Sequence, residues 1–292
     1  MDKCPDFLKG DNMFDWLEDG IADFILNTYR EIGAGMASVM TDAVKSPSVY
    51  NSTAWQSVTK FNADVVLPIA WTILSLFLLL ELVQLFKRAD VRGLDSIYWV
   101  FIIILKILLA KMLMENMTTI INAIFDVSSK MVTSAQVSFN ATSNGFSISD
   151  TAVANLTHAM ESESTVGMMG LMIIGMLIKV ANSFCTVLAK VIVGLRFIEI
   201  YVFTAIASLP FATLSSNEYG SIGKNFIKRM IALALHVIFI VVVLYLYGML
   251  ASGATIDTSS ASNMLFQALG YSILCVIALF QTGSWSKQMM GV

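Results

Sequence analysis

Residues 65–86 read VVLPIAWTILSLFLLLELVQLF and contain a single charged side chain, that of Glu81. A helix needs about 20 such residues to cross the hydrocarbon layer of a bilayer, which is about 30 Å thick. This run therefore predicts a transmembrane helix. The whole chain has the same character, because 57% of its residues are hydrophobic and 13% are charged, against about 25% charged residues in soluble domains. We expect an integral membrane protein.

Further apolar runs follow on the C-terminal side at 97–114, 166–190, 231–250 and 264–280. With 65–86 they predict an all-α, polytopic membrane helix bundle with five full crossings. The chain then divides into four sections: an extracytoplasmic amphipathic N-terminal region (1–60), a first transmembrane hairpin (61–115), a polar extracytoplasmic segment (116–165) and a C-terminal transmembrane core (166–292).

The N-terminal region has an apolar face and an acidic face at helical spacing. Its apolar residues recur mainly every three or four positions, as in an amphipathic helix; they are Phe14, Leu17, Ile21, Phe24, Ile25 and Ile32. The intervening positions carry five carboxylates, Asp15, Glu18, Asp19, Asp23 and Glu31. This helix is too charged to span a bilayer, so we expect it on the membrane surface or against a partner.

The orientation of the spans follows from basic residues in the short loops, which stay in the cytoplasm. Basic side chains gather at 87–92 and 224–229, whereas 116–164 and 252–263 contain almost none. This distribution predicts an outside N-terminus and an inside C-terminus, near Lys287, in a cell membrane.

The stretch 166–214 fits this orientation only if it crosses the membrane an odd number of times. We interpret it as one crossing at 166–190 followed by a membrane-embedded segment at 191–214. Lys190, Arg196 and Glu199 mark the expected join. The alternative is two ordinary helices, which would give six spans.

Ionisable side chains inside apolar runs are costly unless they pair, snorkel or face water. The two helices of the first hairpin bring Glu81 within a few turns of Lys106, and further pairs at helical spacing are Lys111 with Glu115 and Arg196 with Glu199. Internal pairing is one interpretation of these charges. A second is that Lys106 and Lys179 face an aqueous lumen that suits an anionic cargo, and a third is a surface that binds a partner.

Small residues at Gly167, Gly170 and Gly175 allow close approach of helices in a membrane. We expect this run to form a helix contact within or between subunits, and the protein to form a homo-oligomer. The sequence contains no motif of a hydrolase, metalloprotease or nucleotide-binding enzyme. We therefore expect neither catalysis nor a metal or cofactor.

Two stretches resemble a known family: RFIEIYVFTAIASLPFATL at 196–214 and EYGSIGKNFIK at 218–228. They are similar to the core of TrbL-like conjugal transfer proteins, polytopic inner-membrane components of type IV secretion systems, in the version found on Gram-positive conjugative elements. The second proline that is usual near Ala-Ser-Leu-Pro is missing here. The positions that carry the resemblance are Tyr201, Pro210, Glu218, Gly223, Lys224 and Asn225.

This resemblance implies a non-enzymatic channel or scaffold subunit. Such proteins oligomerise in the membrane, work with other secretion-system membrane subunits and cytoplasmic ATPases, and help to move single-stranded DNA with its bound relaxase. Two alternatives remain from the residues themselves: a secondary transporter or small-solute channel, and a viral or eukaryotic membrane protein.

The predicted orientation can be tested by labelling single cysteines in intact cells, in a background without Cys4, Cys185 and Cys275. Ser138→Cys should react with an impermeant maleimide, because the 116–164 segment is expected outside. Lys224→Cys should react only after the cells are opened. The reverse pattern would show that the topology is inverted.

Overall fold

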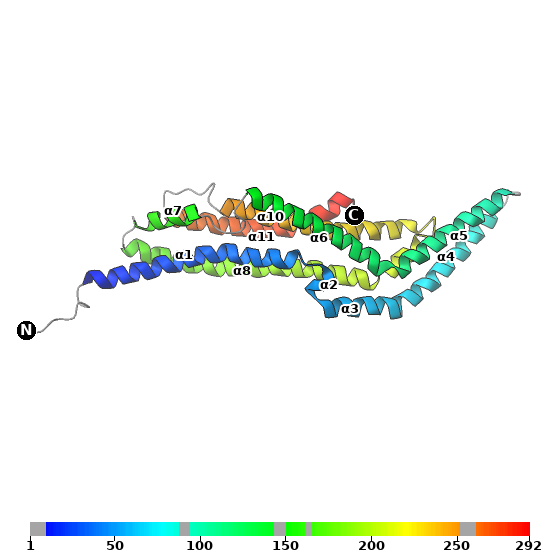
Figure 1. The fold of residues 1–292 in the computed structure, drawn as a ribbon, viewed down its shortest axis with the longest axis horizontal. Helices are drawn as coiled ribbons and strands as arrows, with labels where there is room; N and C mark the ends of the chain where they lie inside the picture. The colour runs from blue at the N-terminus through cyan, green and yellow to red at the C-terminus, as the bar shows by residue number, and fades with distance from the viewer. Residues whose placement is uncertain (1–9, 88–93, 143–149, 162–164, 252–260) are drawn as a thin grey trace, which may run out of the picture. The chain divides into compact units, whose positions relative to one another are not determined.

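In the computed structural model of the chain, every regular element in the described residues is helical (Figure 1). These residues are 10–87, 94–142, 150–161, 165–251 and 261–292. Most of the basic loop at 87–92 and of the polar segment at 252–263 lies outside them. The expected all-α membrane bundle is confirmed.

The helices follow one another with few intervening residues. In chain order they are α1 (Gly10–Ala43), α2 (Pro47–Tyr50), α3 (Ser52–Phe61), the π-helical turn η2 (Asn62–Val66), α4 (Leu67–Lys87), α5 (Leu94–Glu115), α6 (Met117–Thr142), α7 (Asp150–Glu161), α8 (Thr165–Ala205), α9 (Ser208–Thr213), α10 (Gly220–Ala251) and α11 (Ala261–Met290).

Four helical stretches among the described residues are long and apolar enough to cross a membrane: 52–87, 167–205, 220–250 and 261–290. The first contains the predicted span 65–86, extended backwards without a break through α3 and η2. The expected span at 97–114 forms α5, which carries Lys106, Lys111 and Glu115 and is not among the four.

The expected join near Lys190 is wrong, because α8 continues without interruption from Thr165 to Ala205. At 1.5 Å per residue this helix is about 60 Å long, roughly twice the thickness of the hydrocarbon layer. The chain breaks instead after Ala205, where α9 and two connecting turns occupy 206–219. The irregular stretch is therefore shorter than the predicted segment 191–214 and begins later; its place in the membrane stays a prediction.

Contacts group the described residues into two compact units. The first contains α1, α7 and the N-terminal part of α8, together with parts of α6, α10 and α11. Within it α1 runs parallel to α8 (Figure 1). A β-carbon added at Gly175 of α8 would lie 3.3 Å from Phe24 and 3.5 Å from Ile25, and one at Gly35 would meet Thr186 farther along. The N-terminal amphipathic helix thus packs against another helix of its own chain.

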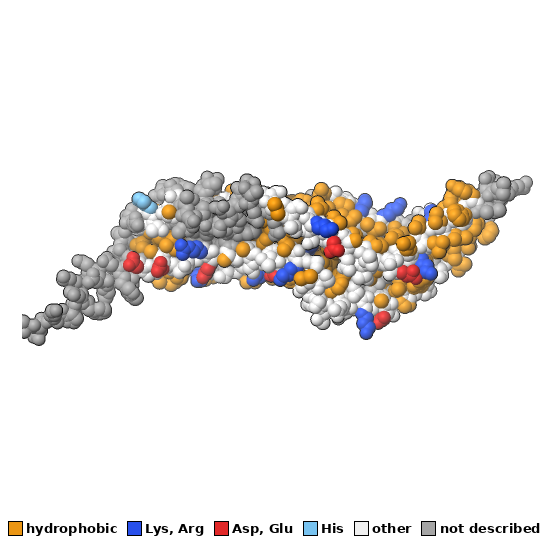
Figure 2. All heavy atoms as spheres, in the orientation of Figure 1, with side chains coloured by type: hydrophobic (Ala, Val, Ile, Leu, Met, Phe, Trp, Pro, Cys, Tyr) orange, Lys and Arg blue, Asp and Glu red, His pale blue; other side chains and the backbone are white. Residues whose placement is uncertain are grey.

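The second unit contains α2 to α5, α9 and the remaining parts of α6, α8, α10 and α11. Here α4 and α5 form the expected hairpin, and α9 contacts both of them. The outer surface of this hairpin is largely hydrophobic (Figure 2). Its most exposed apolar side chains include Leu79, Phe86, Phe101 and Met112, as expected for helices whose solvent is lipid rather than water.

The packing of α1 on α8 predicts a difference between two glycine substitutions. Gly175→Leu should destabilise the protein by about 1–3 kcal/mol, because the larger side chain must displace Phe24 and Ile25. Gly170→Leu is the matched control, since no atom lies within 4 Å of an added β-carbon there. Thermal unfolding in detergent, with proteolysis to follow release of α1, measures the difference. Equal effects of the two variants would contradict this packing.

Candidate functional site

The break between α8 and α10 is the most irregular part of the described C-terminal half. Short turns close its backbone hydrogen bonds: Ala207 N–H donates to Thr204, Leu209 to Ile206, Leu214 to Phe211 and Ser216 to Thr213, over 3.1–3.3 Å. Pro210 lies in the first turn of α9, where its lack of an N–H costs little. Most backbone donors of the break therefore find partners nearby.

Asn62, the first residue of the π-helical turn η2, holds the N-terminal end of this break. Its Nδ2 donates to the carbonyl oxygens of Thr204 (3.3 Å) and Ala205 (3.0 Å). Its Oδ1 accepts from the Ser208 hydroxyl at 2.6 Å. Asn62 and Ser208 are both buried. One amide thus supplies a donor to the Ala205 carbonyl, adds a second donor to the Thr204 carbonyl, which also accepts from Ala207 N–H, and accepts from a hydroxyl at the start of α9.

Asn217 holds the C-terminal end of the break. Its backbone N–H and its Nδ2 donate to the two carboxylate oxygens of Glu81 on α4, at 2.5 and 2.7 Å. Its Oδ1 accepts from the Lys106 ammonium of α5 at 2.6 Å. The expected proximity of Glu81 and Lys106 is therefore achieved through a bridging amide. Glu81 is 5% exposed, so its charge is compensated inside the protein.

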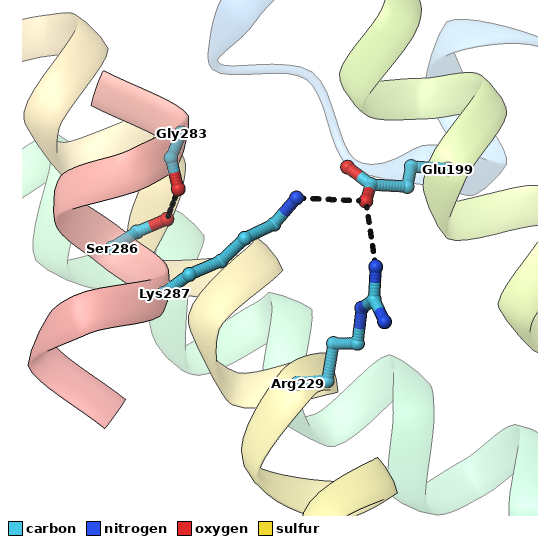
Figure 3. Close-up of polar contacts among 5 residues, drawn as sticks. All are labelled: Glu199, Arg229, Gly283, Ser286 and Lys287. Carbon is cyan, nitrogen blue, oxygen red and sulfur yellow. Dashed lines mark hydrogen bonds and ion pairs between the residues drawn. The ribbon is translucent and has the colours of Figure 1, made fainter. Parts of the chain in front are cut away.

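Glu199 connects α8 with α10 and α11 (Figure 3). Its Oε1 lies 3.0 Å from the Lys287 ammonium of α11 and 3.6 Å from Nη2 of Arg229 on α10. The sequence suggested Arg196 as the partner of Glu199, but the structure gives Glu199 these two cations from other helices. Helical spacing identified Glu199 as a residue that needs a cationic partner, but its partners, Arg229 and Lys287, come from distant parts of the chain.

Arg196 is 3% exposed, and its Nε donates to the Leu233 carbonyl oxygen of α10 at 3.2 Å. Close to it, the rings of Tyr50 and Phe197 stack with centroids 3.8 Å apart. Tyr201 donates its hydroxyl proton to the Pro47 carbonyl oxygen at 2.8 Å. These contacts attach the C-terminal part of α8 to α2 on one side and to α10 on the other.

The residues that carry the family resemblance lie on and around the break. Gly223 of α10 faces α9 so closely that an added β-carbon would lie 2.6 Å from the Pro210 carbonyl oxygen and from Leu214. Only glycine fits there without a shift of the backbone. Glu218, Lys224 and Asn225 are exposed. The motif thus combines one packing requirement with an exposed polar surface.

The other predicted charges have partners within their own unit. Lys111 lies 3.9 Å from Glu115 and 4.9 Å from the centre of the Trp71 ring. Lys179 lies 3.1 Å from Glu31 of α1 and also near the Phe24 ring. Of the three predicted contact glycines, Gly175 is buried against α1, whereas Gly170 is exposed and Gly167 is half-buried.

Sequence reasoning missed Asn62 and Asn217, which hold the two ends of the break. Neutral amides produce no charge signal, and neither residue lies inside an apolar run. A weak signal existed for Asn62, which stands with Asp64 directly before the first span. In the part of the chain that the structure describes, no group of His, Cys, Asp or Glu side chains is arranged to hold a metal ion.

These contacts also constrain depth in the membrane. Asn62 places the beginning of α4 beside the C-terminal end of α8. Arg229 lies near that end of α8 too, because it pairs with Glu199. Lys87 ends α4, roughly 35–40 Å from Asn62 at 1.5 Å per residue. If α4 is a full crossing, Lys87 and Arg229 lie on opposite membrane faces. In that case the basic stretches at 87–92 and 224–229 cannot both be cytoplasmic, as the loop charges predict.

Comparison with known proteins agrees with the motif. A family model described as TrbL/VirB6 plasmid conjugal transfer like protein matches residues 32–208, which is more than half of the 292 residues. The match includes the C-terminal third of α1, the α4–α5 hairpin, all of α8 and Asn62, but not the stretch 218–228. No curated protein and no solved structure matched the chain. The chain belongs to the TrbL/VirB6 plasmid conjugal transfer-like family, whose members are structural components of type IV secretion systems.

Proposed function

We propose that this protein is a channel or scaffold subunit of a conjugative type IV secretion system, and that it helps to move single-stranded DNA with its bound relaxase across the membrane. The observation that carries the proposal is the family match over residues 32–208. The break at 206–219 supports it, because irregular backbone at membrane depth requires cover by protein or a water-filled cavity. In this protein α4 and α5 provide such cover.

We further propose that the subunit acts as a homo-oligomer together with other secretion-system membrane subunits and cytoplasmic ATPases. A few helices in one chain enclose little space, so a conduit for a nucleic-acid strand needs several subunits. Exposed apolar side chains recur along α8, and some of them are available for contacts with another copy; they include Ile173, Leu177, Val180, Phe184 and Val187. The pairing of Lys179 with Glu31 favours internal compensation over a lumen-facing role for this lysine.

For the orientation we propose an inside C-terminus in the cytoplasmic membrane; the outside N-terminus that the loop charges predict stays a prediction. The support is the basic cluster of Arg229 and Lys287, which Glu199 holds together and which the cytoplasmic face would favour. In this orientation α4 begins at the inner face. A full crossing by α4 then carries Lys87 to the outer face, although the loop charges alone predict the inner one.

Two cysteine variants test whether α4 crosses the membrane. Lys87→Cys and Lys228→Cys should react with an impermeant maleimide from opposite sides, because the contacts of Asn62 and Glu199 place these residues at opposite ends of α4. Both positions are exposed, so lack of access does not explain a negative result. Labelling of both from the same side would show that the α4–α5 hairpin does not traverse the bilayer.

The function itself can be tested by mating assays that complement a deletion of this gene. Asn217→Asp should lower transfer by about tenfold or more, because a second carboxylate beside Glu81 replaces a charge-assisted hydrogen bond by repulsion. Adding Glu81→Gln should restore part of the transfer, since the new amide can donate to Asp. Membrane levels of each variant are measured in parallel by immunoblotting.

Asn263→Asp, the same change at an exposed position on α11, is the control and should transfer normally. Wild-type transfer by the deletion strain itself would contradict a role in conjugation. Failure of the Glu81→Gln addition to restore any transfer would contradict the role assigned to this polar bridge and leave the family function intact.

A further inference from the structure

A cavity of about 320 Å³, lined by both polar and apolar side chains, opens on the hydrophobic α4–α5 hairpin beside the Asn217 bridge. Its polar lining consists of Glu81, Gln84, Lys106 and Asn217, and its apolar lining includes Ile102 and Trp99. Both oxygens of Glu81 already accept hydrogen bonds from Asn217. An ammonium group has three donors, and in the described part of the chain Lys106 has one acceptor, Asn217 Oδ1. Two donors of Lys106 therefore remain for a ligand.

A second pocket beside the cavity is lined by Gln84, Lys87, Asn217 and Glu218. Gln84 and Asn217 line both spaces, so the two pockets are neighbours, and we treat them together as one candidate site. Along it the charges are Lys106 and Lys87, which are positive, and Glu81 and Glu218, which are negative. Glu81 is engaged by Asn217, whereas Glu218 is exposed. The site thus offers two ammonium groups and one accessible carboxylate.

Side chains on the rim of the site are suited to lipid. Trp99 is 47% exposed, and an indole with one apolar end and one polar end favours the membrane interface. Leu80, Val83 and Phe86 are exposed beside the polar residues of α4. Figure 2 shows the hydrophobic surface of this hairpin, on which acyl chains can lie. A ligand with a charged head and apolar tails matches both parts of the surface.

We propose that this site binds the headgroup of an aminophospholipid, of the phosphatidylethanolamine type. The phosphate accepts hydrogen bonds from Lys106 and Lys87, and the primary ammonium donates to Glu218 and to the Gln84 carbonyl oxygen. The acyl chains run along Leu80 and Leu76, which are exposed and lie closer to the middle of α4. Bound lipid would supply the acceptors that Lys106 lacks and would stabilise the contact between the hairpin and the α8–α10 break, which goes beyond the role proposed for the protein in conjugation.

The chemistry of the site distinguishes among lipid classes. Phosphatidylcholine carries the same phosphate, but its quaternary ammonium has no N–H to donate, so it loses the contact with Glu218. Phosphatidylglycerol lacks the cation and places hydroxyl groups beside a carboxylate. We expect the apparent affinity for phosphatidylethanolamine to exceed that for either lipid by about tenfold, the effect of one charge-assisted hydrogen bond.

Native mass spectrometry of the full-length protein in detergent, titrated with palmitoyl-oleoyl phosphatidylethanolamine, phosphatidylcholine or phosphatidylglycerol, tests the proposal. Lys106→Gln should weaken phosphatidylethanolamine binding by about tenfold. It should leave the fold intact, because the glutamine amide can still donate to Asn217. Glu218→Gln should reduce the preference for phosphatidylethanolamine over phosphatidylcholine. Lys60→Gln removes an exposed lysine of α3, away from the site, and should change nothing.

Three results would overturn the proposal. The first is equal binding of all three lipids, and the second is binding by Lys106→Gln that matches the wild type. The third is saturable binding of free phosphoethanolamine as tight as that of the intact lipid, which would identify a site for a soluble phosphate compound. None of these readouts depends on DNA transfer, so failure here and failure of the mating experiment are distinguishable.

Discussion

The side-chain amide of Asn62 is the contact on which the arrangement of the second unit depends. When α8 ends at Ala205, its last carbonyl groups lose their helical donors. An unsatisfied carbonyl away from water costs several kcal/mol, so a helix cannot end at such a place without a substitute. Asn62 supplies two donors to these carbonyls and one acceptor to Ser208. Asn62 lies at a π-helical turn, which inserts an extra residue and changes the direction of the side chains that follow. Such turns are frequent at functional sites.

Once Asn62 fixes one end of the break, the length of α4 determines where the other end can be held. Glu81 lies on the same helix, several turns farther along, and receives the N–H and the amide of Asn217. Lys106 completes this contact from α5. The break is thus attached at both ends to a single hairpin, while Gly223 lets α10 approach α9 closely from the other side. Stability and the irregular backbone are compatible here because each end has its own polar partner.

The lengths of the apolar runs in the sequence predicted where the helices lie. The run at 65–86 became α4, and the run at 231–250 lies within α10. Continuity was harder to predict, because Lys190, Arg196 and Glu199 look like a break in an apolar helix. Arg196 and Glu199 are tolerated in α8 because α10 and α11 bring partners to them, which are the Leu233 carbonyl, Arg229 and Lys287. A single sequence carries no signal of such distant pairings, and it carries even less for the neutral amides Asn62 and Asn217.

This division of information has a physical reason. Lipid is as apolar as a leucine side chain, so hydrophobicity places helices in the membrane without specifying which of them become neighbours. Close packing at glycines and polar contacts between helices must supply that choice. Glu199 selects α10 and α11 as neighbours of α8, and Gly175 selects α1. Each such contact joins residues far apart in the sequence, so replacing one partner removes a link between helices that no neighbouring residue of the same helix can replace. The same sparse contacts that specify the fold are therefore the positions where a substitution should alter assembly while every helix stays intact.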